Sequence, residues 1–177
     1  NGVKIYRMSY LGYRGYTILK KNKTATEQEK IRNDLTIAPK SQMPGFAKLP
    51  SYSIYRESQE KMYLPKWYGL EKYGMYDSIK IPEGHSIDIK FKGSIRDEQI
   101  PVVDAYMKSD HGGLLELPCG FGKTVIALNI LSRIKKKTLI IVHKEFLVSQ
   151  WIERIEQFIP EATIGKIQGK ITEIDAD

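Results

Sequence analysis

A glycine-containing loop between two apolar segments constrains this chain more than any other feature. The loop reads Leu117-Pro118-Cys119-Gly120-Phe121-Gly122-Lys123-Thr124. It follows the apolar run 113–117 and precedes the apolar run 125–131. This order predicts a strand, a tight loop and a helix. Such a loop directs backbone N–H groups at a phosphate, and the positive end of the helix dipole favours the same anion.

Two side chains of this loop have predicted chemical roles. Lys123 is expected to reach the β- and γ-phosphates of a nucleotide and the Thr124 hydroxyl to hold Mg²⁺, so these two are the predicted catalytic residues. The usual loop has glycine at the position of Leu117, and a plain glycine turn before an ordinary helix is the alternative. The predicted nucleotide contacts of the loop are Pro118, Cys119, Gly120, Phe121, Gly122, Lys123 and Thr124.

Charge and aromatic content divide the chain into two predicted domains. Residues 1–80 carry 15 Lys and Arg against 7 Asp and Glu, a net charge of +8, and ten of the 11 tyrosines. Residues 81–177 carry a net charge of −1. A basic, tyrosine-rich region suits phosphate neutralisation and base stacking, whereas the alternative is a charged surface over a tyrosine-rich core. Lys20, Lys21 and Lys23 are the predicted backbone-binding cluster.

Composition limits the class of protein. Hydrophobic residues make up 41% of the 177 residues, enough for a core, and no run approaches the roughly 18 apolar residues of a membrane span. We therefore expect no membrane partner. The single cysteine, Cys119, excludes a disulfide within the chain and favours an intracellular, reducing compartment.

Local patterns predict a small α+β domain in residues 1–80. Residues 16–19 are expected to form a strand, and Thr26 with Glu29 gives a capping-box pattern for a helix over 27–33. A second strand is expected over 35–37 and a loop over 40–50. Further strands over 53–56 and 60–63 are more weakly indicated.

Residues 81–177 show the pattern of an α/β fold. Alternating apolar residues predict a half-buried strand over 87–91, and spacings of three and four predict helices over 96–108 and 145–158. The apolar run 138–142 predicts another strand. Strand, crossover helix and strand with nearly continuous apolar strands indicate a buried parallel sheet.

Three blocks of the sequence resemble superfamily 2 helicases and translocases, in the family's order. Residues 95–99, Ile-Arg-Asp-Glu-Gln, resemble the arginine–glutamine motif that reads adenine. Residues 117–124 resemble motif I, and residues 141–151, ending in Gln-Trp, resemble motif Ia. These motifs are similar in form to the motifs of the helicase branch that contains XPB. Residues 15–80 resemble more weakly the N-terminal region of helicases of large DNA viruses, such as the transcript-release helicases of poxviruses.

The resemblance implies a basic α+β domain over 1–80 followed by an incomplete RecA-like P-loop lobe over 81–177. It implies ATP and Mg²⁺ as cofactors, nucleic acid and the transcription machinery as partners, and a viral factory or virion as the location. Arg96 and Gln99 would bind adenine, because an amide can satisfy adjacent donor and acceptor atoms. His143, Lys144 and Gln150 would contact the nucleic-acid backbone, although the family often has Pro-Thr where this chain has His143 and Lys144.

Hydrolysis also needs groups that the sequence does not provide. An acidic residue on Mg²⁺ and an arginine on the transition state are required, and no apolar strand precedes Asp175 or Asp177 to form motif II. We therefore expect the N-terminal part of an ATP-dependent helicase or translocase, inactive as these 177 residues. A non-catalytic nucleic-acid- or partner-binding module and a different P-loop enzyme, such as a nucleotide kinase, are the alternatives.

Overall fold

The computed structural model describes residues 9–38, 50–109 and 112–177. The chain divides into two compact units, Asn1–Pro82 and Glu83–Asp177, called unit 1 and unit 2 below. The loop expected over 40–50 lies outside the described residues except for Pro50. None of the described helices has the length and apolar character needed to cross a membrane.

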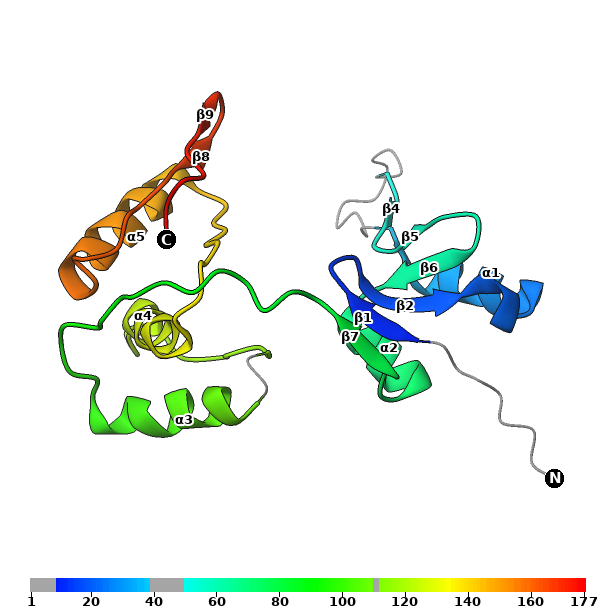
Figure 1. Cartoon of the computed structure of the whole chain (residues 1–177), viewed down its shortest axis with the longest axis horizontal. Helices are drawn as coiled ribbons and strands as arrows, with labels where there is room; N and C mark the ends of the chain where they lie inside the picture. The colour runs from blue at the N-terminus through cyan, green and yellow to red at the C-terminus, as the bar shows by residue number, and fades with distance from the viewer. Residues whose placement is uncertain (1–8, 39–49, 110–111) are drawn as a thin grey trace, which may run out of the picture. The chain divides into compact units, whose positions relative to one another are not determined.

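Unit 1 is built on a five-stranded sheet in the order β5-β6-β2-β1-β7 (Figure 1). Its strands are β1 (Tyr10–Gly12), β2 (Gly15–Leu19), β5 (Arg56–Glu57), β6 (Lys61–Leu64) and β7 (Ser78–Lys80). All neighbours are antiparallel except β1 and β7, which are parallel. The side chain and the backbone N–H of Ser9 bond to the Asp77 carboxylate, which fastens β1 beside β7.

Two helices pack against one face of this sheet. They are α1 (Ala25–Asp34) and α2 (Lys66–Tyr73); a short 3-10 turn, η1 (Lys20–Asn22), precedes α1, and β3 (Thr36–Ile37) pairs with β4 (Tyr52–Ser53) after it. Sheet residues and helix residues share one core, which contains Tyr16, Ile18, Ile31, Leu35, Met62 and Leu64. The absence of a Cβ at Gly69 of α2 lets this helix approach the ring of Tyr16.

The start of α1 differs from the prediction. The helix begins at Ala25, and its capping box pairs Thr24 with Glu27, not Thr26 with Glu29. Thr24 accepts from the Glu27 N–H at 3.2 Å, and the Glu27 carboxylate accepts from the Thr24 N–H at 2.8 Å. The sequence contains both patterns two residues apart. The earlier one also lets Gln28 donate to the carbonyls of Lys20 and Lys23, which ties the helix to the preceding turn.

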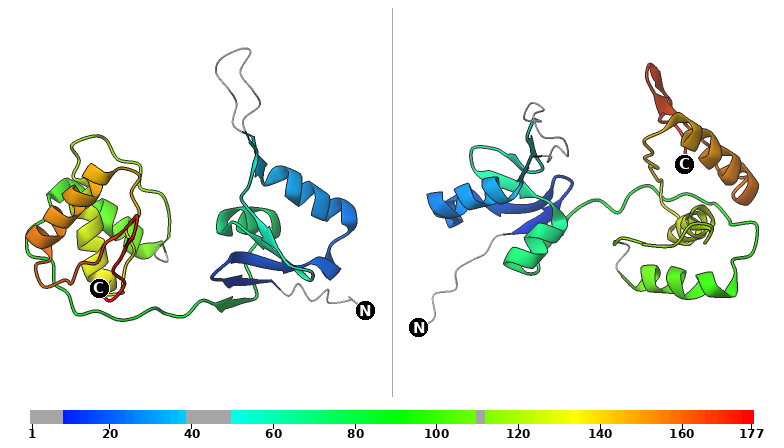
Figure 2. Two further views of the ribbon diagram at one scale, coloured as in Figure 1. Left: turned by 90° about the horizontal axis from the view of Figure 1, so that it is seen from above. Right: turned by 180° about the vertical axis from the view of Figure 1, so that it is seen from behind.

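Unit 2 contains three main helices, with α4 in the centre (Figure 2). They are α3 (Ile100–Lys108), α4 (Lys123–Ile134) and α5 (Glu145–Phe158); η2 (Asp97–Gln99) precedes α3, and the hairpin β8 (Ile167–Gln168) and β9 (Ile171–Thr172) follows α5. Ile126 and Ile130 of α4 pack against Val103 of α3. Leu128 packs with Ile89 and Ile159 in a second cluster that α5 covers.

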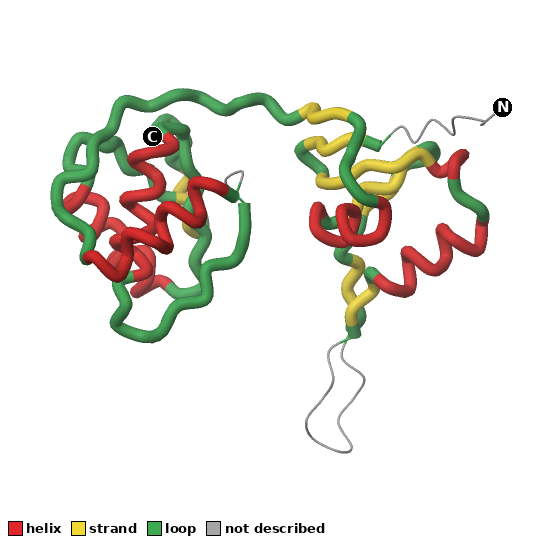
Figure 3. The backbone as a smooth tube through the Cα atoms, turned by 90° about the horizontal axis from the view of Figure 1, so that it is seen from below, coloured by secondary structure: helices red, strands yellow, loops and turns green. Residues whose placement is uncertain are grey.

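The strands expected over 87–91 and 138–142 are wrong for this structure. These segments and the run 113–117 are loops, as Figure 3 shows, and an isolated antiparallel bridge joins Ser86 to Lys136. A strand needs hydrogen-bonded neighbours, and no named strand of the described part of unit 2 pairs with these segments. Leu139 and Ile141 are accordingly 70% and 83% exposed. The mixed α/β class is confirmed, but the buried parallel sheet expected over 81–177 does not form among the described residues of unit 2, whose named strands are the antiparallel pair β8 and β9. Helices α4 and α5 lie where the sequence predicts them, and α3 begins at Ile100, four residues after its predicted start.

Candidate functional site

The glycine loop of unit 2 ends in a left-handed turn from which α4 begins. Gly120 and Gly122 have φ angles of 77° and 87°, in the region that favours glycine. Gly122 is the N-cap residue, and no side chain caps the helix. The first N–H groups of a helix have no intrahelical partner. The start of α4 can therefore bind an anion such as a phosphate, which the dipole of the helix also favours.

Arg96 and Gln99 hold this loop from the start of α3. The Arg96 guanidinium donates to the Phe121 carbonyl oxygen at 2.7 Å and to the Gly120 carbonyl oxygen at 3.3 Å. The Gln99 amide donates to the same Phe121 oxygen at 2.7 Å, and its own oxygen accepts from the Arg96 N–H at 2.9 Å. The structure thus brings both predicted adenine-motif residues into contact with loop residues that lie 22 or more positions further along the chain.

The close approach of Gln99 explains why glycine stands at position 122. The Gln99 side chain is 2% exposed, and a Cβ at Gly122 would lie 2.5 Å from its amide nitrogen. A side chain there would displace the amide from the Phe121 carbonyl. Gly120 has no atom within 4 Å of the corresponding position, so its requirement for glycine comes from the backbone angle alone.

The Lys123 side chain folds back onto the glycine loop. Its ammonium group donates to the Pro118 carbonyl oxygen at 2.8 Å, which closes the loop on itself. Thr124 is half-buried, and within the described ranges its hydroxyl makes no hydrogen bond. Cys119 is a free, exposed thiol. No three acidic, histidine or cysteine side chains gather to hold a metal ion in the part of the chain that the structure describes.

The environment of Arg96 is partly solvated. Its guanidinium also pairs with Glu98 at 3.1 Å, and both side chains are more than half exposed. Such a surface pair contributes at most about 1 kcal/mol. The guanidinium lies 5.9 Å from the centre of the Phe121 ring, while that ring packs beside the core of α3 and α4. Arg96 is therefore held by the two loop carbonyls and keeps part of its surface available.

The predicted backbone-contacting residues lie where α5 begins. Lys144 is the N-cap residue of α5, and His143, Lys144 and Gln150 are all exposed. The opposite side of α5 packs Trp151, Ile155 and Phe158 against the core of unit 2. All three residues are thus accessible to solvent: His143 and Lys144 just before α5, and Gln150 in its second turn.

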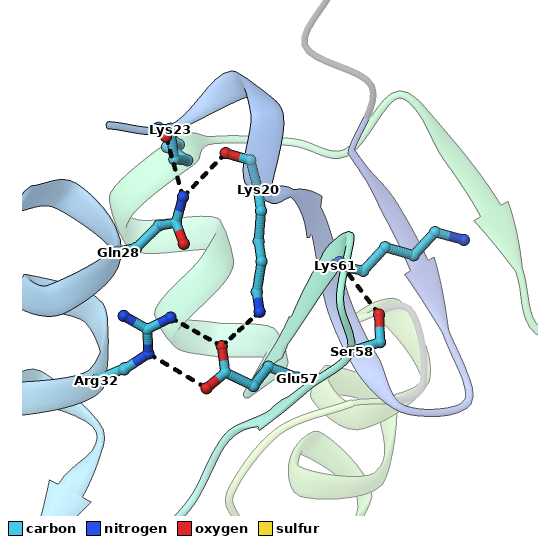
Figure 4. A network of polar contacts seen from close by, with 7 residues as sticks. All are labelled: Lys20, Lys23, Gln28, Arg32, Glu57, Ser58 and Lys61. Atoms are coloured by element: carbon cyan, nitrogen blue, oxygen red, sulfur yellow. Dashed lines mark hydrogen bonds and ion pairs between the residues drawn. The ribbon is translucent and has the colours of Figure 1, made fainter. Parts of the chain in front are cut away.

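The predicted lysine cluster of unit 1 is largely engaged within the protein. Lys20 pairs with Glu57 at 2.8 Å, and Lys23 pairs with Glu27 at 3.4 Å and lies 4.2 Å from the centre of the Tyr73 ring. Figure 4 shows Lys20 directed at Glu57. The Lys20 and Lys23 side chains are each 19% exposed, whereas Lys21 is exposed. The role of this cluster in nucleic-acid binding stays a prediction.

Glu57 is the centre of a polar cluster of unit 1 that the sequence analysis missed. Arg32 donates to both of its carboxylate oxygens, at 3.2 and 3.0 Å, and Lys20 is its second basic partner. These hydrogen bonds, Arg32 first, lower the pKa of Glu57 to about 2. The three residues join β5, α1 and η1. No local sequence pattern identifies this cluster, because Glu57 lies 25 or more residues from both of its basic partners.

An apolar cavity in unit 2 is separate from the glycine loop. Its volume is about 570 Å³, and it lies between α5 and the segments 137–142 and 162–167. No residue of 117–124 lines it, and most of its walls are isoleucine, leucine and valine side chains. Such walls suit apolar packing and do not suit a triphosphate.

Comparison with known proteins relates most of unit 2 to a family. Residues 92–177 match the family described as "Type III restriction enzyme, res subunit". The mixed α/β structure of unit 2 is consistent with a partial RecA-like helicase lobe. The matched residues include the Arg96–Gln99 segment, the glycine loop and α5.

Relatives with sequence similarity include viral and archaeal proteins. "Putative ATP-dependent RNA helicase L396" of Acanthamoeba polyphaga mimivirus is 36% identical over 168 residues, covering 89% of this chain and 32% of that protein. "Putative helicase 109L" of Invertebrate iridescent virus 3 is 36% identical over 109 residues, 57% of this chain and 33% of that protein. "DNA 3'-5' translocase XPB2" of Sulfurisphaera tokodaii is 38% identical over 100 residues, 53% of this chain and 22% of that protein. The chain thus spans a third or less of the length of these relatives.

Proposed function

We propose, for a chain that belongs to the XPB-like branch of the superfamily 2 helicases, that unit 2 binds ATP at the glycine loop. In the whole protein, this binding would power movement along nucleic acid. The observation that carries the proposal is the shared contact of Arg96 and Gln99 on the Phe121 carbonyl. It brings a polar adenine motif and a phosphate-type loop together at the start of one helix.

The proposal gives each loop residue a task. The ammonium group of Lys123 would exchange the Pro118 carbonyl for the phosphate oxygens of the nucleotide, which are stronger acceptors because they are charged. The backbone N–H groups at the start of α4 would bind the same phosphates. Thr124 would hold Mg²⁺ through its hydroxyl, and the ion would neutralise phosphate charge there.

Adenine would lie beside Arg96 and Gln99. Both amide atoms of Gln99 already have one partner, yet an amide has two hydrogens and two lone pairs. One donor and one acceptor therefore remain, and because Gln99 is 2% exposed, an adenine edge would reach them by displacing the side chains that cover the amide. Under this proposal Gln99 both positions the loop and contributes to base selection, and His143, Lys144 and Gln150 contact the nucleic-acid backbone.

Calorimetric titration with Mg-ATP tests the nucleotide site. We expect binding to the wild-type chain and its loss in Lys123→Ala, because the variant removes the phosphate-binding charge from an exposed position. The matched control is Lys108→Ala, an exposed lysine at the end of α3, which should bind like wild type. Equal affinity in wild type and Lys123→Ala would contradict the proposed site.

A further inference from the structure

The face of the unit 1 sheet opposite α1 and α2 carries a row of aromatic and polar side chains. Tyr10, Thr17 and Tyr63 are direct neighbours in the registers of β1, β2 and β6. Successive side chains of a strand point to opposite faces. Leu11, Tyr16, Ile18, Met62 and Leu64 face the helices and the core, so Tyr10 and Tyr63 face away from them. No described helix of unit 1 packs on this second face.

Basic groups surround the two rings. The Arg14 guanidinium lies 5.2 Å from the centre of the Tyr63 ring. The Lys80 ammonium lies 4.3 Å and the Lys61 ammonium 5.7 Å from the centre of the Tyr10 ring. Figure 4 shows the Lys61 side chain extending away from the Glu57 cluster. We call Tyr10, Arg14, Lys61, Tyr63 and Lys80 the tyrosine face.

The basic groups of the tyrosine face have no acidic partner among the described residues of unit 1: no ion pair there involves Arg14, Lys61 or Lys80. On the helix side, by contrast, Lys20 and Arg32 are paired with Glu57. The tyrosines divide in the same way: Tyr16, Tyr55, Tyr68, Tyr73 and Tyr76 belong to the core. The free positive charge and the remaining sheet tyrosines therefore lie on the same surface.

We propose that the tyrosine face binds single-stranded nucleic acid. Bases stack on Tyr10 and Tyr63, and phosphates pair with Arg14, Lys61 and Lys80. The strands that carry the two rings are separated by β2, two strand spacings or about 10 Å between backbones, and we expect each ring to take a different base. The inference deepens the proposed function and rests on it for the choice of nucleic acid as ligand. It assigns a strand-binding surface to unit 1, in addition to the residues proposed for the glycine loop and α5 of unit 2.

Physical chemistry favours a single strand over other anionic partners. A duplex keeps its bases stacked inside, whereas a single strand offers unstacked bases to exposed aromatic rings. An acidic peptide would use the charges and leave the rings without a stacking partner. The combination of rings and free cations is therefore best matched by a flexible chain that has both π-faces and phosphates.

Fluorescence anisotropy with a labelled single-stranded oligonucleotide tests the rings. In the 177-residue chain, we expect Tyr63→Leu to weaken binding by about five- to a hundredfold, the range for removing one stacked base contact. Tyr63→Phe keeps the ring and should stay within about twofold of wild type. Wild-type affinity in Tyr63→Leu would overturn the proposal, as would equal losses in the two variants. Thermal melting checks that each variant is folded.

Charge variants test the proposal independently of the half-buried ring. Lys80→Gln and Arg14→Gln change exposed residues, and each should reduce the slope of log affinity against log salt by about 0.7, the single-strand value per phosphate. The matched control is Lys30→Gln, an exposed lysine of α1 on the helix side of the sheet, and it should leave the slope unchanged. Slopes unchanged in Lys80→Gln and Arg14→Gln would overturn the proposal, and so would tighter binding to a duplex than to the single strand.

The two proposals can fail separately. Lys123→Ala should bind the oligonucleotide like wild type if the tyrosine face is the binding surface, although it loses Mg-ATP. A chain that binds the oligonucleotide through Tyr63 and does not bind Mg-ATP would contradict the nucleotide site alone. A chain that binds Mg-ATP and is insensitive to Tyr63→Leu would contradict the tyrosine face alone.

Discussion

The side-chain amide of Gln99 donates a 2.7 Å hydrogen bond to the backbone carbonyl of Phe121. This contact joins the start of α3 to the glycine loop that precedes α4, across 22 residues of sequence. The amide is almost fully buried, so water cannot replace the bond. The shape of the predicted phosphate loop therefore depends on a residue whose sequence motif suggests only base recognition.

Replacement of Gln99 separates these two roles. Gln99→Ala removes the donor to Phe121 and the acceptor for the Arg96 N–H, and a buried group left without its partner costs about 1–3 kcal/mol. We expect both Mg-ATP and inorganic tripolyphosphate to bind more weakly, ATP by the larger factor because it also loses the adenine contact. Calorimetric titration measures both ligands. Unchanged tripolyphosphate affinity would show that Gln99 does not position the loop.

Alanine at two glycines tests the close approach of Gln99. Gly122→Ala should destabilise unit 2 more than Gly120→Ala. Both positions have positive φ, which costs about 1–2 kcal/mol for a residue with a Cβ, but only the Cβ at 122 meets the Gln99 amide, at 2.5 Å. Urea unfolding of the two variants measures the difference. Equal midpoints would mean that Gln99 moves aside without cost.

Local sequence patterns predicted α1, α3, α4 and α5, but no helix was predicted at α2 (Lys66–Tyr73). The spacing of Leu147, Trp151, Ile155 and Phe158 predicts a helix over 145–158, which is α5 to the residue, because an amphipathic period reflects burial on one side. The capping pattern placed α1 two residues late, since Thr24 and Thr26 begin equivalent patterns and only the bonds of Gln28 to the preceding turn favour the first.

Strand pairing and contacts over long sequence separations could not be predicted in the same way. Alternation in 87–91 correctly marks Ile89 as buried, but a strand also needs a partner, and periodicity does not supply one. The pairing of β1 with β7 joins residues 68 apart in the sequence. At the candidate site, the motifs predicted that Arg96 and Gln99 bind the adenine of the nucleotide whose phosphates the glycine loop binds. The hydrogen bonds of both side chains to the Phe121 carbonyl could not be predicted. Every residue has a backbone carbonyl, so no sequence pattern identifies which one accepts the bonds.

Glu57 gives unit 1 an acid-sensitive contact. Its pKa is lowered from 4.5 to about 2, chiefly by the hydrogen bonds from Arg32 and then Lys20. The folded state therefore gains stability from this carboxylate above the unfolded pKa of 4.5, and the gain is lost as pH falls from 4.5 towards 2. Because the side chain is 31% exposed, we expect a loss of about 1–2 kcal/mol after solvent screening.

The measurement is the stability of wild type, Glu57→Gln and Glu60→Gln between pH 7 and pH 2. Glu57→Gln should be less stable than wild type at pH 7, and the difference should shrink as pH falls through the window between 4.5 and 2. Glu60→Gln changes an exposed carboxylate close in sequence and leaves Arg32 and Lys20 with their partner, so it should follow the wild-type curve. A constant difference between wild type and Glu57→Gln at all pH values would exclude the ionised contact as its cause.

The lysines at positions 20, 21 and 23 should contribute less to nucleic-acid binding than their number suggests. The ion pairs with Glu57 and Glu27 hold two of them, and a phosphate would have to displace a carboxylate from each. We therefore expect the triple glutamine variant to flatten the salt dependence of single-strand binding by about one phosphate contact, a slope change of about 0.7. Lys21→Gln alone should produce the same change, because Lys21 is exposed. Filter binding at several salt concentrations compares the two variants, and a threefold larger change in the triple variant would show that Lys20 and Lys23 also leave their internal partners for the nucleic acid.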